Sequence, residues 1–470
     1  MRMRPNPHWG YMLGPALLVG VAGAGQEPLR IPLLSVDAGA VTSTLEAPDV
    51  ARPVGRKVTF PQAIEQALAR NPNALVAAAD IDRVHGIMEE IRAASLPTLA
   101  VNATYTRLNS ERTFPNSLPD GGNTNVIVAA RDSLNANAVL SIPIIAPQAW
   151  ANWARAGNQV DVARASARDV QRTVAINTGR AYLTIFAQKR QVDVFRQARD
   201  NALEHFRYAD ARLRGGIGNR IDWARAGEEL ETNEANLQTS FANLYRSQEA
   251  LGILLGEDGP VDVDEVPQIP QAPSLEQAIA EAPTRADVLL YRQQQTAADR
   301  SLNLSWTEYL PTLAVTGQPF YQNPSSLSSP ETGWSAQALF TWYLFDGGAR
   351  YGRTHQREAQ LSQARIQYEA ISREANSEVR AALDTMERAR AAVERSRNGA
   401  QLANDAMRLA EVAYRAGAST NLELIDAQRR ARDAETQANL AENNERQATL
   451  DYLAAAGRFP VQLQPAASSR

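Results

Sequence analysis

The amino-acid sequence predicts a mainly α-helical fold with a β-barrel portion in a membrane, built as a tandem repeat of one β-hairpin and one long α-helical hairpin. Three observations predict it. The hexapeptide LPTLAV occurs at 96–101 and again at 310–315, two long windows lack proline, and four segments alternate apolar with polar residues.

The N-terminus has the order of a secretory signal. Arg2 and Arg4 precede an apolar stretch over about 11–21, and the small residues AGA follow at 22–24. An anchor helix is the alternative, but this apolar stretch is too short to span about 30 Å of hydrocarbon. Residues 1–24 are therefore expected to be a cleaved signal peptide.

Two copies of one unit follow. Gly216 and Gly417 lie 201 positions apart, as do Gly256 and Gly457, which each close a helical run. Such a constant offset indicates a tandem repeat. The expected organisation is a flexible N-terminal segment (25–57), repeat 1 (58–257), a Pro- and acid-containing linker (258–274), repeat 2 (275–459) and a C-terminal tail (460–470).

Proline placement shows where long helices can form. No proline lies between Pro147 and Pro260, or between Pro330 and Pro460. An interior proline costs a helix about 3 kcal/mol, so both windows permit uninterrupted helix. Apolar residues recur there at spacings of 3, 4 and 7, the seam pattern of coiled coils. Long helices are expected over about 148–214 and 349–415, with return helices over about 219–256 and 420–456.

Period-two segments predict strands over about 98–108, 132–142, 312–321 and 334–345. In the first, the odd positions are apolar, and most of the even positions are polar. The apolar residues are Leu99, Val101, Ala103 and Tyr105, and the polar residues are Thr98, Asn102, Thr104 and Thr106. Pro319 is expected to end its strand or to mark a bulge. A half-buried soluble sheet gives the same alternation, but export and very long helices favour transmembrane strands.

Four strands cannot close a barrel, and open sheet edges are not tolerated in lipid. Because the smallest barrels have about eight strands, closure requires several chains, such as a dimer with eight or a trimer with twelve. The connection NSERTFPNSLPDGGNTN at 109–125 is longer than its counterpart in repeat 2 and is expected at the cell exterior.

Composition argues against catalysis, cofactors and nucleic acid. The chain has 470 residues, a formal charge of −4, no cysteine and four scattered histidines without metal-ligand spacing. The GGIGNR segment follows a helix rather than a strand, so its glycines are interpreted as turn residues. No enzyme activity, metal or cofactor is predicted.

The motif LFDGG (344–348) opens a long helix, and YRAGASTNLELIDAQ (414–428) occupies a helical turn. In this order, the parts of the chain over about 58–459 resemble the TolC-like outer-membrane efflux protein family. Repeat 1 departs from the pattern, with PIIAPQA in place of LFDGG.

The resemblance implies a homotrimer whose strands form one twelve-stranded barrel, continued by an α-barrel of twelve helices. It implies that the protein is the exit duct of a tripartite efflux or secretion system, located in the outer membrane of a Gram-negative-type cell. The implied partners are a periplasmic adaptor protein, an inner-membrane pump and outer-membrane lipid. A periplasmic coiled-coil scaffold or adaptor with a soluble β-domain is the alternative.

The two helical turns are expected to be periplasmic tips, and the resemblance makes them the adaptor-docking surface. The predicted docking residues are Arg214, Gly215, Gly216, Ile217, Gly218, Arg415, Ala416, Gly417, Ala418, Ser419 and Thr420.

Charged residues near the tips recur between the two copies. The simpler interpretation is a solvated face whose i, i+3 pairs contribute only tenths of a kcal/mol. The alternative is a periplasmic gate that attracts cations and is held by inter-helix ion pairs. The candidate gate residues are Glu204, Asp210, Asp405, Arg408 and Glu411.

Overall fold

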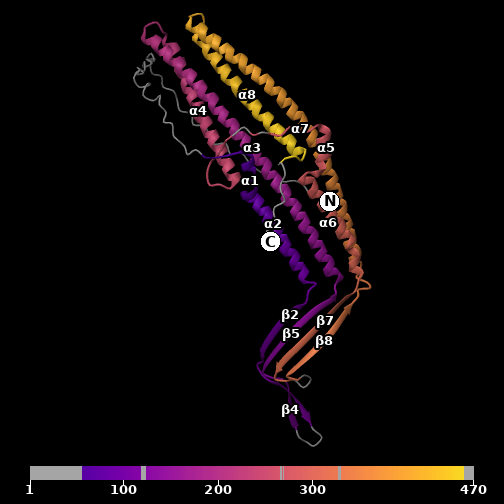
Figure 1. Ribbon diagram of the computed structural model, residues 1–470. Helices are drawn as coiled ribbons and strands as arrows, with labels where there is room; N and C mark the ends of the chain where they lie inside the picture. The colour runs from indigo at the N-terminus through magenta and orange to yellow at the C-terminus, as the bar shows by residue number, and fades with distance from the viewer. Residues whose placement is uncertain (1–54, 118–122, 265–266, 268, 326–329, 460–470) are drawn as a thin grey trace, which may run out of the picture. The chain divides into compact units, whose positions relative to one another are not determined.

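The computed structural model describes residues 55–117, 123–264, 267, 269–325 and 330–459 (Figure 1). The predicted signal peptide, most of the 25–57 segment and the 460–470 tail lie outside these residues. No helix of the described part is both long enough and apolar enough to cross a bilayer.

Long helices make up most of each repeat. Repeat 1 contains α1 (Phe60–Arg70), α2 (Pro72–Ala93), α3 (Pro147–Arg214) and α4 (Arg220–Leu255). Repeat 2 contains α5 (Leu275–Glu281), the 3-10 helix η1 (Ala282–Thr284), α6 (Ala286–Asn303), the 3-10 helix η2 (Ser305–Tyr309), α7 (Ala349–Arg415) and α8 (Asn421–Ala455).

Four antiparallel strands form one sheet in the order β2-β5-β7-β8. They are β2 (Thr98–Arg107), β5 (Asp132–Ile145), β7 (Thr312–Asn323) and β8 (Thr332–Thr341). The long connection of repeat 1, expected as a loop, instead forms a second hairpin from β3 (Arg112–Ser117) and β4 (Asn123–Ala129).

The register of the sheet separates apolar from polar side chains. Leu99 lies opposite Leu140 and Val101 opposite Ala138, whereas Asn102 lies opposite Asn137. Because side chains alternate between faces, one face of β2 and β5 is apolar and the other is mainly polar, with Ala100 and Val139 as its apolar pair. The apolar face is uncovered in the single chain, where Leu99 is 69% and Val101 75% exposed.

Pro319 lies inside β7, contrary to the expectation that it would end or bulge the strand. Its pairing with Trp334 of β8 is in regular register. On the other side, β7 pairs with β5 at Asn137↔Phe320 and at Leu140↔Gly317. The two positions of β7 between these pairs, which include Pro319, have no partner in β5. The strand therefore accommodates a residue without an N–H by omitting part of one ladder.

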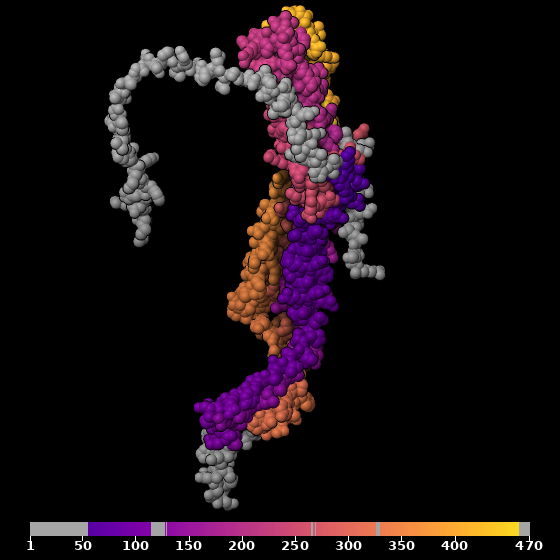
Figure 2. All heavy atoms as spheres, turned by 90° about the vertical axis from the view of Figure 1, so that its left-hand side faces the viewer, coloured from indigo at the N-terminus to yellow at the C-terminus, as the bar shows by residue number. Residues whose placement is uncertain are grey.

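The helices follow the same lateral order as the strands. α2 contacts α3, α3 contacts α6, and α6 contacts α7. The helix α2 leads into β2 and β5 leads into α3, while η2 leads into β7 and β8 into α7 (Figure 1). Figure 2 shows the continuity of α2 with β2 from another side.

A short parallel sheet joins the start of repeat 1 to the linker that follows it. β1 (Arg56–Val58), which falls mostly in the segment expected to be flexible, pairs with β6 (Val261–Val263) in the expected linker. These strands pack with α1, α3 and α4 around the largest apolar cluster. Its members include Val58, Ala63, Tyr182, Ile185, Leu251 and Val261.

The LFDGG motif caps the start of α7. The Asp346 carboxylate accepts hydrogen bonds from the backbone N–H groups of Gly348 (3.2 Å) and Arg350 (3.0 Å), which satisfies donors at a helix N-terminus. The Arg350 guanidinium lies 4.7 Å from the ring centroid of Tyr309. In repeat 1 the equivalent position to Gly348 is Pro147, which has no N–H to satisfy.

Gly348 has φ +89°, a conformation that strains side-chain-bearing residues, and a Cβ there would meet no atom within 4 Å. We therefore expect Gly348→Ala to lower the free energy of unfolding by about 1–2 kcal/mol through backbone strain alone. The matched change Gly352→Ala, inside α7 and equally open, should raise it by about 1 kcal/mol. Unfolding in detergent followed by circular dichroism measures both, and equal effects would contradict this account.

Candidate functional site: the helical tips and the contact between the hairpins

The turns that end α3 and α7 have the same geometry. Gly216 has φ +75° and Gly417 has φ +76°. The next residue in each turn bonds back into the helix, with Ile217 N–H donating to the Arg212 carbonyl at 3.1 Å and Ala418 N–H donating to the Ala413 carbonyl at 2.8 Å. This is the Schellman arrangement, which needs a left-handed residue and therefore favours glycine.

The return helices begin with different caps. Asn219 Oδ1 accepts the Ile221 N–H at 3.0 Å at the start of α4. At α8, Thr420 and Glu423 form a reciprocal capping box, and Glu423 also accepts from the Ser419 hydroxyl at 2.5 Å. The predicted docking residues lie in the two turns, except Arg214 and Arg415, which end α3 and α7. All are exposed except the half-buried Gly218 and Ser419.

The predicted gate residues do not form one cluster in a single chain. Glu204 and Glu411 line the same small cavity between α3 and α7. Asp210 instead binds Arg214 at 2.9 Å and accepts from the Trp223 indole at 3.2 Å, both within the α3/α4 hairpin.

Asp405 lies on a different face of α7, where it pairs with Arg408. Leu402, Leu409 and Val412 share this face at helical spacing and are 67–71% exposed. The result is an uncovered apolar stripe with one carboxylate in its middle. We call Leu402, Asp405, Leu409 and Val412 the α7 stripe.

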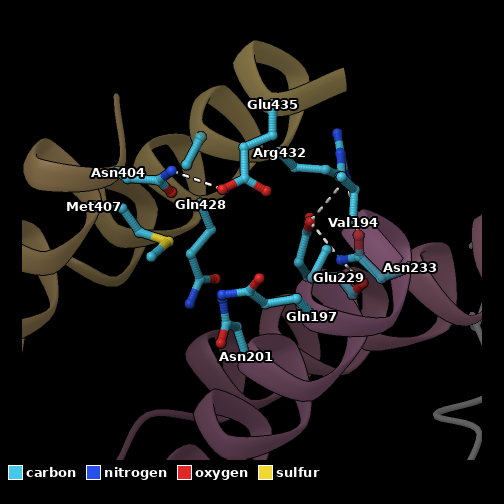
Figure 3. A pocket seen from close by; sticks show the side chains of 12 residues that line it. Val194, Gln197, Asn201, Glu229, Asn233, Asn404, Met407, Gln428, Arg432 and Glu435 are labelled. Atoms are coloured by element: carbon cyan, nitrogen blue, oxygen red, sulfur yellow. Dashed lines mark hydrogen bonds and ion pairs between the residues drawn. The ribbon is translucent and has the colours of Figure 1, made fainter. Parts of the chain in front are cut away.

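Polar groups join the α3/α4 hairpin to the α7/α8 hairpin. The Glu229 side chain of α4 is only 2% exposed and accepts from Arg429 Nε of α8 at 2.5 Å. Arg432 lies 3.4 Å from the same carboxylate and donates to Asn233 at 3.0 Å. Glu229, Asn233 and Arg432 border a cavity of about 20 Å³. The hydrogen-bonded pair Asn404 and Glu435 also lines it (Figure 3).

The polar contact continues away from the tips. Glu442 of α8 binds Arg190 of α3 at 2.7 Å and Arg397 of α7 at 2.8 Å, and Arg446 lies 3.3 Å away. Desolvation raises the pKa of Glu442, but the hydrogen bond from Arg397 and the charges of all three arginines outweigh it and hold the pKa below 4.5. The energy of this contact is therefore present above pH 4.5 and is lost as pH falls through the lowered pKa.

Sequence reasoning missed several residues of this contact. His205, grouped with the scattered histidines, is 6% exposed and lies 2.6 Å from Asn421. Helical periodicity places His205 beside Ala202, Phe206 and Ala209, and that position on the seam was the available signal. Glu229 gave no such signal, because nothing in a charged helix tells which carboxylate meets the other hairpin. In the described part of the chain, no group of three or more acidic or histidine side chains could hold a metal ion.

Comparison with known proteins places these features in a family. The family model described as "Outer membrane efflux protein" matches residues 63–257 and 275–458. The outer membrane protein OprJ of Pseudomonas aeruginosa is 26% identical over 56% of this chain and 57% of its own length. The outer membrane efflux protein BepC of Brucella suis is 26% identical over 59% of this chain and 61% of its own length. The chain thus spans about three-fifths of the length of these relatives.

Solved structures show the same fold. The Campylobacter jejuni CmeC outer membrane channel matches with a TM-score of 0.69 at 16% identity, covering 88% of this chain and 91% of that one. A membrane protein from Pseudomonas aeruginosa matches with a TM-score of 0.70 at 20% identity, covering 86% and 91%. The predicted fold class is confirmed.

Removing the buried charge should loosen the contact between the hairpins. We expect Glu229→Gln to cost about 3 kcal/mol of unfolding free energy, because it removes the buried carboxylate that Arg429 and Arg432 share. Glu228→Gln is the matched control: its carboxylate also binds Arg429 but is 61% exposed, so it should cost less than about 1 kcal/mol. Chemical denaturation in detergent compares them, and a smaller loss for Glu229→Gln than for Glu228→Gln would refute the assignment.

Proposed function

The chain belongs to the outer membrane efflux protein family, and we propose that three copies of it form a passive exit duct across the outer membrane of a Gram-negative cell. The observation that carries this proposal is the amphipathic four-stranded sheet that continues into four helices in the same lateral order. Membership of an efflux family agrees with the predicted outer-membrane location and with a role in transport rather than catalysis.

The sheet itself supports assembly from several copies. β2 and β8 are its edge strands, and within the described residues each pairs with one strand. Lipid cannot satisfy the backbone groups of an open edge. Pairing β8 of one copy with β2 of the next satisfies both edges, and three copies close a barrel of twelve strands.

The α7 stripe supports the same assembly in the helical part. Its exposed leucines and valine are spaced to pack against a helix of the next copy. Asp405 then lies at or beside the boundary between copies, where it recurs by symmetry. A trimer thus continues the barrel of strands with a barrel of helices.

The tips support docking of a partner protein. Ile217 is 75%, Leu422 57% and Ile221 56% exposed, so each trimer presents apolar side chains at its periplasmic end. Exposed apolar groups gathered at one site mark protein interaction surfaces. We propose a periplasmic adaptor as the partner, which joins the duct to an inner-membrane pump.

A periplasmic scaffold with a soluble β-domain fits the structure less well. Such a domain buries the apolar face of its sheet, but Val101 is 75% and Trp334 78% exposed here. Lipid is the solvent that suits this face.

Membrane fractionation and reconstitution test the proposed function. We expect the full-length protein in the outer-membrane fraction, a detergent-resistant trimer, and ion-conducting channels in planar lipid bilayers. A soluble monomer or dimer that conducts no ions would refute the duct and favour the scaffold.

Bulky substitutions at the tips test docking. Gly216→Trp and Gly417→Trp should each reduce export at least about tenfold while the trimer stays intact, because the new side chains point from the exposed turns toward the adaptor. Gly417→Asn is the control, since asparagine tolerates the left-handed conformation with a small side chain. Unchanged export by both Trp variants would exclude docking at these turns.

Neutralising the tip acids tests the gate. We expect Asp405→Asn and Glu411→Gln to lower the preference for cations by about fivefold, since a nearby unit charge is worth about 1 kcal/mol in water. Asp384→Asn is the matched control, because Asp384 forms a similar i, i+4 pair with Arg388 on the same helix but far from the tip. Reversal potentials in salt gradients report the preference, and a selectivity that none of the changes alters would remove the gate proposal.

A further inference from the structure

One buried histidine links the two hairpins close to the tips. His205 of α3 packs edge-on against Tyr414 in the last turn of α7, with ring centroids 5.3 Å apart. Its Nε2 lies 2.6 Å from Oδ1 of Asn421, the first residue of α8. His205 thus contacts both helices of the opposite hairpin at their turn.

The bonding of Asn421 fixes which imidazole atom carries a proton. Asn421 Nδ2 donates to the Asp222 carbonyl of α4 at 3.1 Å, so Oδ1 faces His205 as an acceptor. The His205 Nε2–H must therefore be the donor, and Nδ1 is the atom that takes up a second proton. In its neutral form His205 completes a chain of hydrogen bonds from α3 through α8 to α4.

Charged and titratable groups face His205 from three of the four helices. They are Glu204 and Tyr208 on α3, Asp222 and Glu229 on α4, and Glu411, Tyr414 and Arg415 on α7, while α8 contributes the neutral Asn421 and Gln428. Burial lowers the pKa of His205 below 6.5, and the hydrogen bond to Asn421 and the acids Asp222, Glu411 and Glu229 oppose this only in part. Packed between the hairpins, the imidazole is neutral at neutral pH.

We propose that His205 is a proton-sensitive link which holds the two hairpins together when neutral and favours their separation when protonated. The proposal rests on the proposed duct, whose helical tips it would open. Separation of the hairpins brings the ring into water, where the imidazolium is solvated, so the separated state binds more protons than the packed one. The packed state is therefore fully stable above the ordinary pKa of 6.5 and weakens as pH falls from there toward the lowered value.

The other contacts between the hairpins cannot supply this response. The charged contacts among them join arginines to carboxylates, as in Glu229 with Arg429 and Glu442 with Arg190, whereas histidine is the side chain whose ordinary pKa lies between pH 5 and 8. Among the histidines of the described residues, His355 is exposed on α7 and His85 is half-buried on α2, away from this contact. His205 is the described histidine that lies in it.

The test compares the trimer at pH 7.5 and pH 5.0. Spin labels on cysteines at positions 217 and 418 report the distance between the two turns, free of background because the chain has no cysteine. Single-channel conductance is measured on the same samples. We expect the wild-type turns to move apart at pH 5.0. The ratio of separated to packed states can rise by up to about tenfold for each pH unit by which packing lowers the pKa of His205.

The variants distinguish titration from structure. His205→Gln retains an N–H donor for Asn421 but cannot titrate, so its distance and conductance should be the same at both pH values. His205→Phe keeps the contact with Tyr414 and serves if the Gln variant does not assemble. His355→Gln should respond to acid as the wild type does.

Two results would overturn the switch. Either the wild-type trimer conducts ions with the same tip distance at both pH values, or the His205 variants retain the full acid response. Both leave the duct intact. Absence of conductance at any pH would instead refute the proposed function on which the switch rests.

Discussion

Backbone hydrogen bonding in the four-stranded sheet is the constraint on which the rest of the structure depends. In lipid every N–H and C=O must be paired, so the strands need a fixed order and their two outer edges need partners. Each strand runs into or out of a helix with few intervening residues. The order β2-β5-β7-β8 is therefore imposed on α2, α3, α6 and α7, which extend the arrangement of the sheet into water.

Within the helical part, apolar and polar contacts have different roles. Each hairpin is held internally by apolar packing, as where Phe206 and Ala209 of α3 meet Ala226 and Leu230 of α4. Near the tips the contact between hairpins is instead polar, through Glu229 and its arginines. Apolar packing keeps each hairpin as one unit. Polar contacts can exchange with water, so the hairpins can separate near the tips while the apolar contact of Leu183 of α3 with Leu450 and Leu453 of α8, farther from the tips, stays buried.

The sequence alone predicted the parts with a long repeating signal. Strands in contact with two different solvents alternate apolar and polar residues, as at Val101 to Tyr105, and proline marks where a helix of 68 residues such as α3 is possible. β1 was missed because three residues are too few to show a period. Pro319 was misjudged because its tolerance depends on the neighbouring ladder. The site was only partly predictable: glycine identified both turns, but helical periodicity does not tell that Glu229 meets α8 and Asp405 does not.

The pair formed by Glu228 and Arg429 has a consequence for the tandem repeat itself. These residues occupy equivalent positions in the two repeats, 201 residues apart, yet their side chains meet at 2.9 Å. Positions that are equivalent in two repeats and also touch lie close to the pseudo-symmetry axis relating them. A chain made of two identical first repeats would put glutamate opposite glutamate there, and two identical second repeats would oppose arginines. The two halves are therefore complementary in charge at this point of their axis.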